Sequence, residues 1–152
     1  MGGGVTLSGG EPLLQADFCV ELLKQLKGQV HTAIETSGFA NADTFQKVIS
    51  LCDFVYMDVK LADAEQHKKY TGVDNRQILA NAAWLKQSGI KHTFRTPLIP
   101  DITDTEENLK AIERIAGNSP WEKLAYNPLA GAKYASVGRN FNLKKGVNHD
   151  EL

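Results

Sequence analysis

The stretch GGGVTLSGGEP, residues 2–12, places a short β-branched run directly before two glycines, a glutamate and a proline. The valine, threonine and leucine of this run favour an extended strand, which we predict at residues 4–8. Gly9 and Gly10 then predict a tight turn. Adjacent glycines do not match the spaced glycines of a P-loop or of a dinucleotide-binding fingerprint. The stretch therefore predicts a strand that ends in a sharp turn, with Glu11 directly beyond it.

The rest of the chain alternates between short β-branched runs and amphipathic segments. In the amphipathic segments apolar residues recur every three or four positions, as in a helix with one buried face. We therefore predict strands at 4–8, 30–36, 54–59, 91–96 and 123–127, and helices over 18–26, 45–49, 62–70, 78–85 and 109–115.

The ends of these helices are predicted from glycines and short polar side chains. Glycine after a helix favours the left-handed conformation of a helix stop, and Asp or Asn before a helix caps its free N–H groups. The expected stops are Gly28 and Gly89, and the expected caps are Asp43, Asp74 or Asn75, and Asp104.

Alternation of strands and helices predicts an α/β fold with a parallel sheet and right-handed crossovers. Five strands form either an open sheet or part of a barrel. No linker, repeat or shift of composition divides the 152 residues, so we expect a single domain over 1–152. The periodic pattern supports an ordered core at about 2–134 and fades from 135 onward.

Composition excludes several classes of function. The net charge is −1, without a block of lysine or arginine, so neither nucleic acid nor a membrane surface is an expected partner. No apolar run approaches the ~20 residues of a membrane span, and no signal peptide is recognisable. We therefore expect a cytoplasmic protein. Cys19 and Cys52 are the only cysteines, lie in apolar segments without ligand spacing, and are expected to be reduced and structural.

Every predicted strand ends in a charged or hydrogen-bonding residue. In parallel βα architectures ligands bind beyond the carboxyl ends of the strands, so these side chains are the candidate site. In strand order they are Glu11; Glu35 and Thr36; Asp58 and Lys60; Arg95 and Thr96; and Asn127.

Some of these residues also fit structural roles. Glu11 is compatible with a solvated carboxylate in a first helical turn, where the helix dipole stabilises it. Asp58 and Lys60 are compatible with a surface ion pair worth under about 1 kcal/mol. Glu35 and Arg95 lie in apolar surroundings, where a charge is costly unless it is paired, and this favours a functional role for both.

Five segments together resemble the activating enzymes of glycyl radical enzymes, the pyruvate formate-lyase activase group of the radical S-adenosylmethionine superfamily. The resemblance covers about residues 2–145, in the order and spacing of the family. The matching segments are VTLSGGEPL (5–13), AIETSG (33–38), YMDVK (56–60), RTPLIP (95–100) and YNPLAGAKY (126–134).

The resemblance implies a partial (βα)6 barrel whose first strand would precede residue 2, and S-adenosylmethionine as a ligand. It also implies a possible monovalent cation bound near Glu35, Thr36 and Asp58. The implied cofactor-binding residues are Gly9, Gly10, Glu11, Asp58, Val59, Lys60, Arg95 and Asn127.

Two features depart from the family pattern. The Cys-x3-Cys-x2-Cys motif that holds the family's [4Fe-4S] cluster is absent, so iron–sulfur ligands are not expected in this chain. Asn127 stands where the family usually has a histidine, and its amide cannot carry charge. The resemblance thus implies that the cluster belongs to a longer parent protein and that the chain alone is inactive.

The function implied for the parent is generation of a glycyl radical on a partner enzyme, through hydrogen abstraction by a 5′-deoxyadenosyl radical. The implied partners are a glycyl radical enzyme similar to pyruvate formate-lyase and an electron donor such as flavodoxin or ferredoxin. The alternative is a stand-alone binding module that uses the same strand ends for a nucleotide-like ligand or a protein, without redox chemistry. If the first strand is missing, strand 4–8 is an open edge, which predicts self-association or cover by the chain's own ends.

Overall fold

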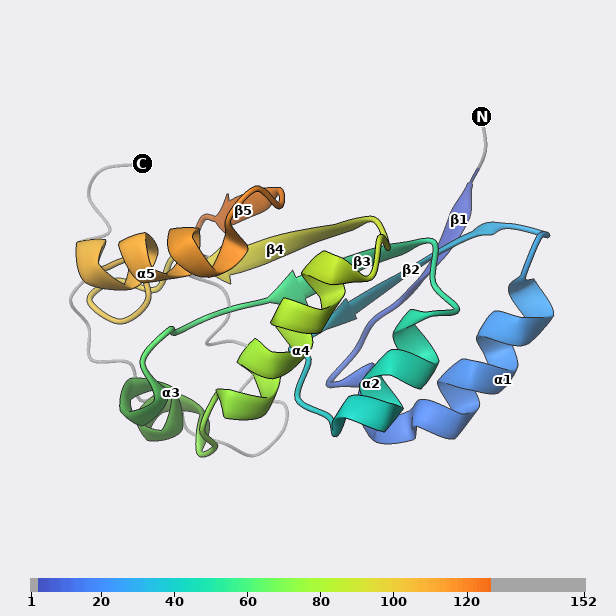
Figure 1. The fold of residues 1–152 in the computed structure, drawn as a ribbon, viewed down its shortest axis with the longest axis horizontal. Helices are drawn as coiled ribbons and strands as arrows, with labels where there is room; N and C mark the ends of the chain where they lie inside the picture. Colours follow the sequence, from blue (N-terminus) through green and yellow to red (C-terminus); the bar gives the residue numbers. More distant parts are fainter. Residues whose placement is uncertain (1–2, 127–152) are drawn as a thin grey trace.

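The computed structural model describes residues 3–126, which form one five-stranded parallel sheet with its strands in chain order (Figure 1). The strands are β1 (Gly4–Leu7), β2 (His31–Thr36), β3 (Phe54–Asp58), β4 (His92–Pro97) and β5 (Trp121–Leu124). The predicted parallel α/β fold is confirmed. The last strand was expected at 123–127 and starts earlier, at Trp121, whose aromatic ring the β-branched pattern did not include. Asn127 and the predicted core boundary at 134 lie outside the described residues.

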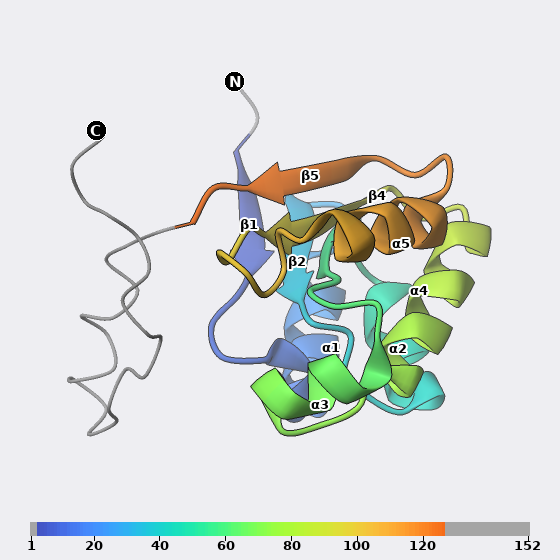
Figure 2. The same cartoon turned by 90° about the vertical axis from the view of Figure 1, so that its left-hand side faces the viewer.

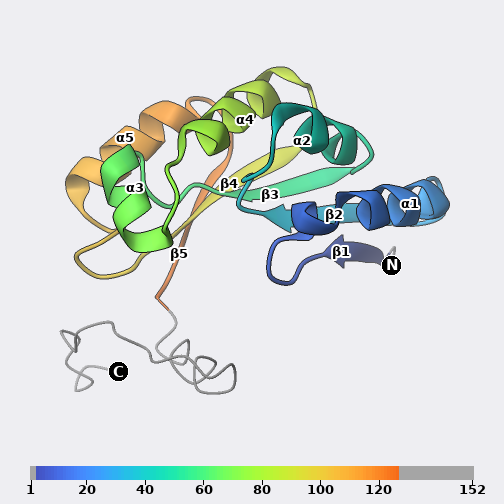
Figure 3. The ribbon, with the colours of Figure 1, turned by 90° about the horizontal axis from the view of Figure 1, so that it is seen from below.

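The helical elements lie on one side of this sheet, as the views in Figures 2 and 3 show. Each crossover returns the chain to the same end of the sheet, and this brings the carboxyl ends of the strands together. The elements are the 3-10 helix η1 (Pro12–Gln15), α1 (Ala16–Leu26), α2 (Ala42–Ile49), α3 (Ala64–Thr71), α4 (Arg76–Gln87) and α5 (Glu106–Ala116).

Two of the predicted caps are wrong. α2 is capped by Asn41, whose Oδ1 accepts a hydrogen bond from the Thr44 N–H at 2.8 Å. α5 is capped by Thr105, while the Asp104 carboxylate accepts from the Asp101 N–H at 2.8 Å. Neighbouring polar residues cap equally well, so the path of the incoming loop decides which one is used.

The other predicted helix ends agree better with the structure. The predicted cap of α4 was Asp74 or Asn75. Asn75 occupies the N-cap position, although its side chain makes no capping hydrogen bond. Gly28 and Gly89 both have positive φ angles, 76° and 75°, in the left-handed region expected of a helix stop.

The core lies between the sheet and the helices. From the sheet it contains Ile34, Val55, Met57 and Phe94, and from the helices Leu23, Phe45, Val48, Ile49, Leu85 and Ile112, all almost fully buried. These are the positions that the period-2 and helical patterns place on one face.

Cys19 and Cys52 lie in this core as free thiols, as predicted. Burial raises the pKa of both, that of Cys52 to about 12, so both stay protonated at neutral pH.

Two further features bear on function. Within residues 3–126, β1 pairs with β2 alone, so its other side is an unpaired edge, and Val5 on this strand is exposed. No helix in the described part of the chain has both the length and the apolar character needed to cross a membrane.

Candidate functional site

The candidate site lies on the sheet face that the helices leave uncovered. Strand register places Tyr56 beside Glu35 and Thr93, and Asp58 beside Arg95. Because side chains alternate along a strand, these residues face away from the core while their sequence neighbours are mostly buried beneath the helices. All five are half-buried. The alternation that builds the core thus lines the opposite face with polar side chains.

Four charged side chains at this face form one network, joined by a serine. Arg95 Nη1 lies 3.0 Å from Glu35 Oε1, and its Nε lies 3.2 Å from Asp58 Oδ1. Lys60 Nζ lies 3.2 Å from the other oxygen of Asp58, and Ser8 Oγ donates to Glu35 Oε2 at 2.8 Å. We call these five residues the rim network. It connects the carboxyl ends of four strands, with two cations balancing two carboxylates.

The network is electrostatically coupled. The Ser8 hydroxyl and the Arg95 guanidinium lower the pKa of Glu35, against a smaller opposing effect of burial. Burial disfavours the charged form of Arg95, but the carboxylates of Asp58 and Glu35 outweigh it and raise the pKa of Arg95. Arg95 also lies over the Tyr56 ring, 5.0 Å from its centroid. The expectation that Glu35 requires a cation is confirmed, and that cation is Arg95.

Glu11 has a different environment. Its Oε1 accepts from Thr36 Oγ1 at 2.6 Å and from the Leu13 N–H at 3.2 Å. Its Oε2 accepts from the Ser37 N–H at 2.8 Å and from Ser37 Oγ at 2.5 Å. These four bonds use the lone pairs of a carboxylate and tie the loop after β1 to the loop after β2. A direct contact of the Glu11 carboxylate with a cofactor stays a prediction, and its observed role is to hold the two loops together.

The two glycines before Glu11 are exposed and leave their main chain accessible. Gly9 has a φ of 132°, which side-chain-bearing residues rarely adopt. No atom lies within 4 Å of the point where a Cβ would stand on Gly9 or Gly10. At the end of β1 the main chain is therefore the group available to a ligand.

Val59 and Asn127 complete the predicted cofactor set. Val59 is buried, its N–H donates to the Arg95 carbonyl at 2.9 Å, and its carbonyl accepts from Thr96 Oγ1 at 2.7 Å. It therefore fixes the backbone between Asp58 and Lys60. Asn127 lies outside the described residues.

The side chains of the three residues predicted to hold a monovalent cation do not all lie on one face of the sheet. Glu35 and Asp58 share the open face, but each is paired with Arg95. Thr36 is buried on the helix side, where its Oγ1 donates to Glu11 and accepts from the Gly38 N–H at 2.9 Å. Adjacent residues of a strand point to opposite faces, so the side chains of Glu35 and Thr36 diverge.

Sequence patterns missed Ser8 and Tyr56 as members of this face. A signal was present for Tyr56, which lies two residues before Asp58 and therefore on the same side of β3. No local signal connects Ser8 with Glu35, since the contact depends on how the chain leaves β1.

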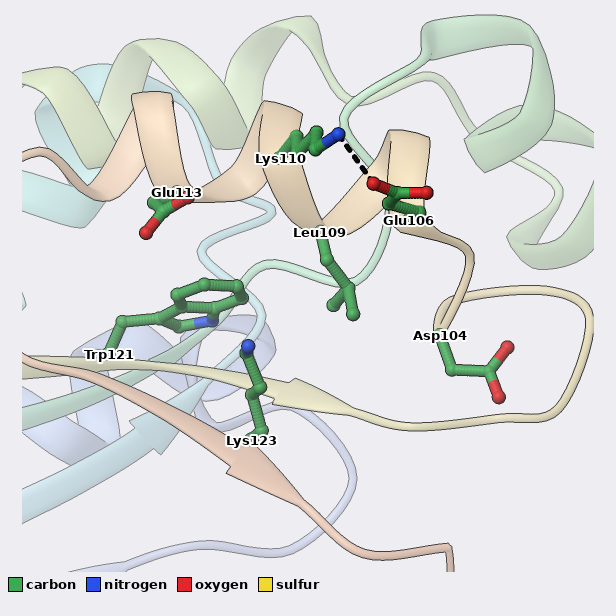
Figure 4. A pocket seen from close by; sticks show the side chains of 7 residues that line it. All are labelled: Asp104, Glu106, Leu109, Lys110, Glu113, Trp121 and Lys123. Carbon is green, nitrogen blue, oxygen red and sulfur yellow. Dashed lines mark ion pairs between the residues drawn. The ribbon is translucent and has the colours of Figure 1, made fainter.

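A separate hollow lies between α5 and β5, on the helix side of the sheet (Figure 4). Its volume is about 310 Å³, and the Lys110–Glu106 pair lies on its α5 wall. Trp121 and Lys123 of β5 form the opposite wall, with the Lys123 amine 4.6 Å from the centroid of the Trp121 ring. None of the predicted site residues within 3–126 lines it.

Comparison of the sequence with known protein families agrees with this site. The model of the radical SAM superfamily matches residues 2–112. The chain belongs to this superfamily. The family resemblance inferred from the strand-end motifs is confirmed, and the cofactors of the superfamily are S-adenosylmethionine and a [4Fe-4S] cluster.

The chain is similar to activating enzymes within the superfamily. It is 37% identical over 156 residues to the isethionate sulfite-lyase activating enzyme of Oleidesulfovibrio alaskensis, covering 99% of this chain and 50% of that protein. It is 40% identical over 149 residues to the 4-hydroxyphenylacetate decarboxylase activating enzyme of Clostridium scatologenes, covering 94% of this chain and 48% of that protein. The chain spans about half the length of these curated relatives.

A solved structure supports the same assignment. A domain of pyruvate-formate lyase-activating enzyme from Bacteroides vulgatus matches with a TM-score of 0.70 at 32% identity, covering 80% of this chain and 76% of that chain. The fold prediction of a partial parallel barrel agrees with this similarity.

The two family cofactors fit the residues of this chain differently. S-adenosylmethionine carries an ammonium, a carboxylate and a sulfonium, and the rim network presents both carboxylates and cations. A [4Fe-4S] cluster needs thiolates. The two thiols of this chain lie in the core with raised pKa values, donating to the carbonyls of Pro12 and Val48. The cysteines present therefore do not fit the cluster.

Proposed function

We propose that this chain is the S-adenosylmethionine-binding part of an activating enzyme for a glycyl radical enzyme. The observation that carries the proposal is the rim network: paired charges from four strand ends on the uncovered face of a radical SAM fold. In a parallel sheet this edge is where ligands bind.

The residues of the network suit the amino-acid end of the cofactor. The Lys60 ammonium and the Arg95 guanidinium can bind a carboxylate, while Asp58 and Glu35 can accept hydrogen bonds from an ammonium or a ribose hydroxyl. The main chain of Gly9 and Gly10 allows close approach at the end of β1. Because the network is preformed, these groups bind and orient the cofactor without a costly reorganisation.

The whole parent protein would also hold the [4Fe-4S] cluster, through cysteines that this sequence does not contain. When both cofactors are bound, they supply the one-electron chemistry that removes a hydrogen atom from a glycine of the partner enzyme. For this parent we propose a glycyl radical enzyme as partner, flavodoxin or ferredoxin as electron donor, and a cytoplasmic location. The chain alone would be inactive.

Calorimetric titration of the full chain with S-adenosylmethionine tests the proposed binding. We expect saturable binding that weakens at least tenfold, a loss of about 1.4 kcal/mol, in Asp58→Ala and in Lys60→Ala. Lys47→Ala is the matched control, because Lys47 also pairs with an aspartate, Asp17, but on the exposed helix surface. Absence of binding, or equal affinity in all three variants, would contradict the proposal. Tighter binding of another nucleotide would favour the stand-alone module.

We also propose that the open edge of β1 mediates self-association. Gly4, Val5 and Thr6 are exposed along this edge, and an unpaired strand is a template for a second copy. Sedimentation velocity should show association that increases with concentration and is abolished by Val5→Lys, which adds charge to the edge. Val73→Lys is the matched control, since Val73 has the same 36% exposure but lies after α3. A monomer at every concentration rules out the association.

A further inference from the structure

Two buried asparagines from the helix layer hold the backbone directly after β3. Asn108 of α5 accepts at Oδ1 from the Ala62 N–H at 2.9 Å, and its Nδ2 donates to the Lys60 carbonyl at 3.0 Å. Asn75, at the start of α4, donates from Nδ2 to the carbonyls of Leu61 at 2.9 Å and Ala62 at 2.8 Å. Both side chains are almost fully buried, with 8% and 1% exposed. Four backbone groups of residues 60–62 are thus bound by two side chains.

Only a side-chain amide can make the set of hydrogen bonds that Asn108 makes. The Lys60 carbonyl and the Ala62 N–H require one donor and one acceptor on the same short side chain, and Asn108 also donates to the Thr103 carbonyl at 2.8 Å. An aspartate would turn a carboxylate oxygen toward two carbonyls, and an apolar residue would leave buried groups unpaired. The side chain of Asn75 makes no capping bond to α4, so its hydrogen bonds serve the segment 60–62.

This segment carries a member of the rim network. Lys60 is anchored through its carbonyl to Asn108, while its amine reaches Asp58 at 3.2 Å. A lysine on an unanchored loop would populate many rotamers, and ordering it in one of them would cost conformational entropy when a ligand binds. The hydrogen bond from Asn108 fixes the backbone of Lys60, so that less conformational entropy is lost when the lysine side chain binds a ligand.

We propose that Asn108 and Asn75 are positioning residues that preset Lys60 for cofactor binding. This inference rests on the proposed function of the rim network as the S-adenosylmethionine site. The two residues contact no proposed ligand, and they act through the backbone of residues 60–62.

A double-mutant cycle on cofactor affinity tests the connection. In calorimetric titrations with S-adenosylmethionine we expect Asn108→Ala and Lys60→Ala each to weaken binding about tenfold, and the double variant to resemble Lys60→Ala alone. Fully additive losses would show that Asn108 acts independently of Lys60 and would overturn the inference. A Lys60→Ala variant with unchanged affinity would instead overturn the proposed function of the network.

Hydrogen exchange of the Ala62 amide provides a second readout that needs no ligand. In Asn108→Ala this amide should exchange at least tenfold faster than the change in global stability predicts, because its acceptor is gone. Ile112→Val, a core change one turn away on α5, should alter Ala62 exchange only as far as global stability changes, and should leave cofactor affinity unaltered. If Asn108→Ala does not fold, Asn75→Ala tests the same segment at the neighbouring carbonyls. Unchanged local exchange in the folded variant overturns the positioning role.

Discussion

Replacement of Gly38 by alanine is expected to lower the free energy of unfolding by about 3 kcal/mol. Gly38 has a φ of 72°, where an alanine loses roughly 1 kcal/mol to strain. A Cβ at this position would also overlap the terminal methyl of Met57 and lie 3.6 Å from the Phe45 ring. The Phe45 contact is an ordinary one, but the Met57 side chain is fully buried and must change its rotamer within the packed core, which costs a further ~2 kcal/mol.

Urea unfolding followed by tryptophan fluorescence would measure this loss, since Trp84 packs edge-on against Phe45 with ring centroids 5.9 Å apart. Gly28→Ala is the matched control. Gly28 has a φ of 76°, but no atom lies within 4 Å of its would-be Cβ, so this variant should lose only the strain. Equal losses in the two variants would disprove the overlap with Met57.

Replacement of Arg95 by methionine is expected to destabilise the protein by about 2 kcal/mol at neutral pH. Methionine keeps much of the length of the side chain but leaves Glu35 and Asp58 without their shared cation. Removing one partner of a fully buried pair costs roughly 3–5 kcal/mol. The side chain of Arg95 is 15% exposed and that of Glu35 is 36% exposed, so solvent reduces the loss.

The effect of Arg95→Met should depend on pH in a defined direction. In the folded protein Ser8 and Arg95 hold the pKa of Glu35 below its ordinary value of 4.5. A lowered carboxyl pKa adds stability that is complete above the ordinary value and is lost as pH falls through the folded-state pKa. The difference between wild type and variant should therefore be constant near neutral pH and shrink below about pH 4.5.

Urea titrations at a series of pH values would measure this dependence. Ser8→Ala should also reduce the loss of stability that accompanies protonation of Glu35 at acid pH, because the Ser8 hydroxyl is the largest cause of the lowered Glu35 pKa. Arg76→Met removes the Arg76–Asp74 pair, whose arginine side chain is 84% exposed, and should change stability little at neutral pH. A difference between wild type and Arg95→Met that persists unchanged at pH 3 would contradict the assignment of Glu35 as the titrating group.

Several parts of the site followed from local patterns. The need of Glu35 for a cation was predicted, because an apolar environment penalises a lone charge, and a pair of Asp58 with Lys60 was one of two interpretations of these residues, because a strand alternates its faces. The same alternation places the side chains of Glu35 and Thr36 on opposite faces, and a monovalent cation near Glu35, Thr36 and Asp58 stays a prediction. Neighbouring positions on a strand are enough to show that these two side chains diverge.

Other parts depended on contacts between distant segments. The hydrogen bond that the Glu11 carboxylate accepts from Ser37, 26 residues along the chain, was not predicted, and the contact of Glu11 with a cofactor stays a prediction. The two hydrogen bonds of Asn108 to residues 60–62 span 48 and 46 residues. Periodicity assigns a residue to a face or a loop, but it does not specify which loop packs against it.

The sequence by itself determined the order of strands and helices, the parallel sheet, the buried face and the absence of a cysteine motif for a cluster. These follow from short-range rules: side-chain period, β-branched runs, glycine stops and composition. Only the tertiary structure decided that Arg95 joins Glu35 across 60 residues, that Glu11 ties two loops together and that Asn108 and Asn75 hold the backbone of residues 60–62. Such contacts depend on how strands and loops lie side by side after packing, and packing is a property of the whole chain.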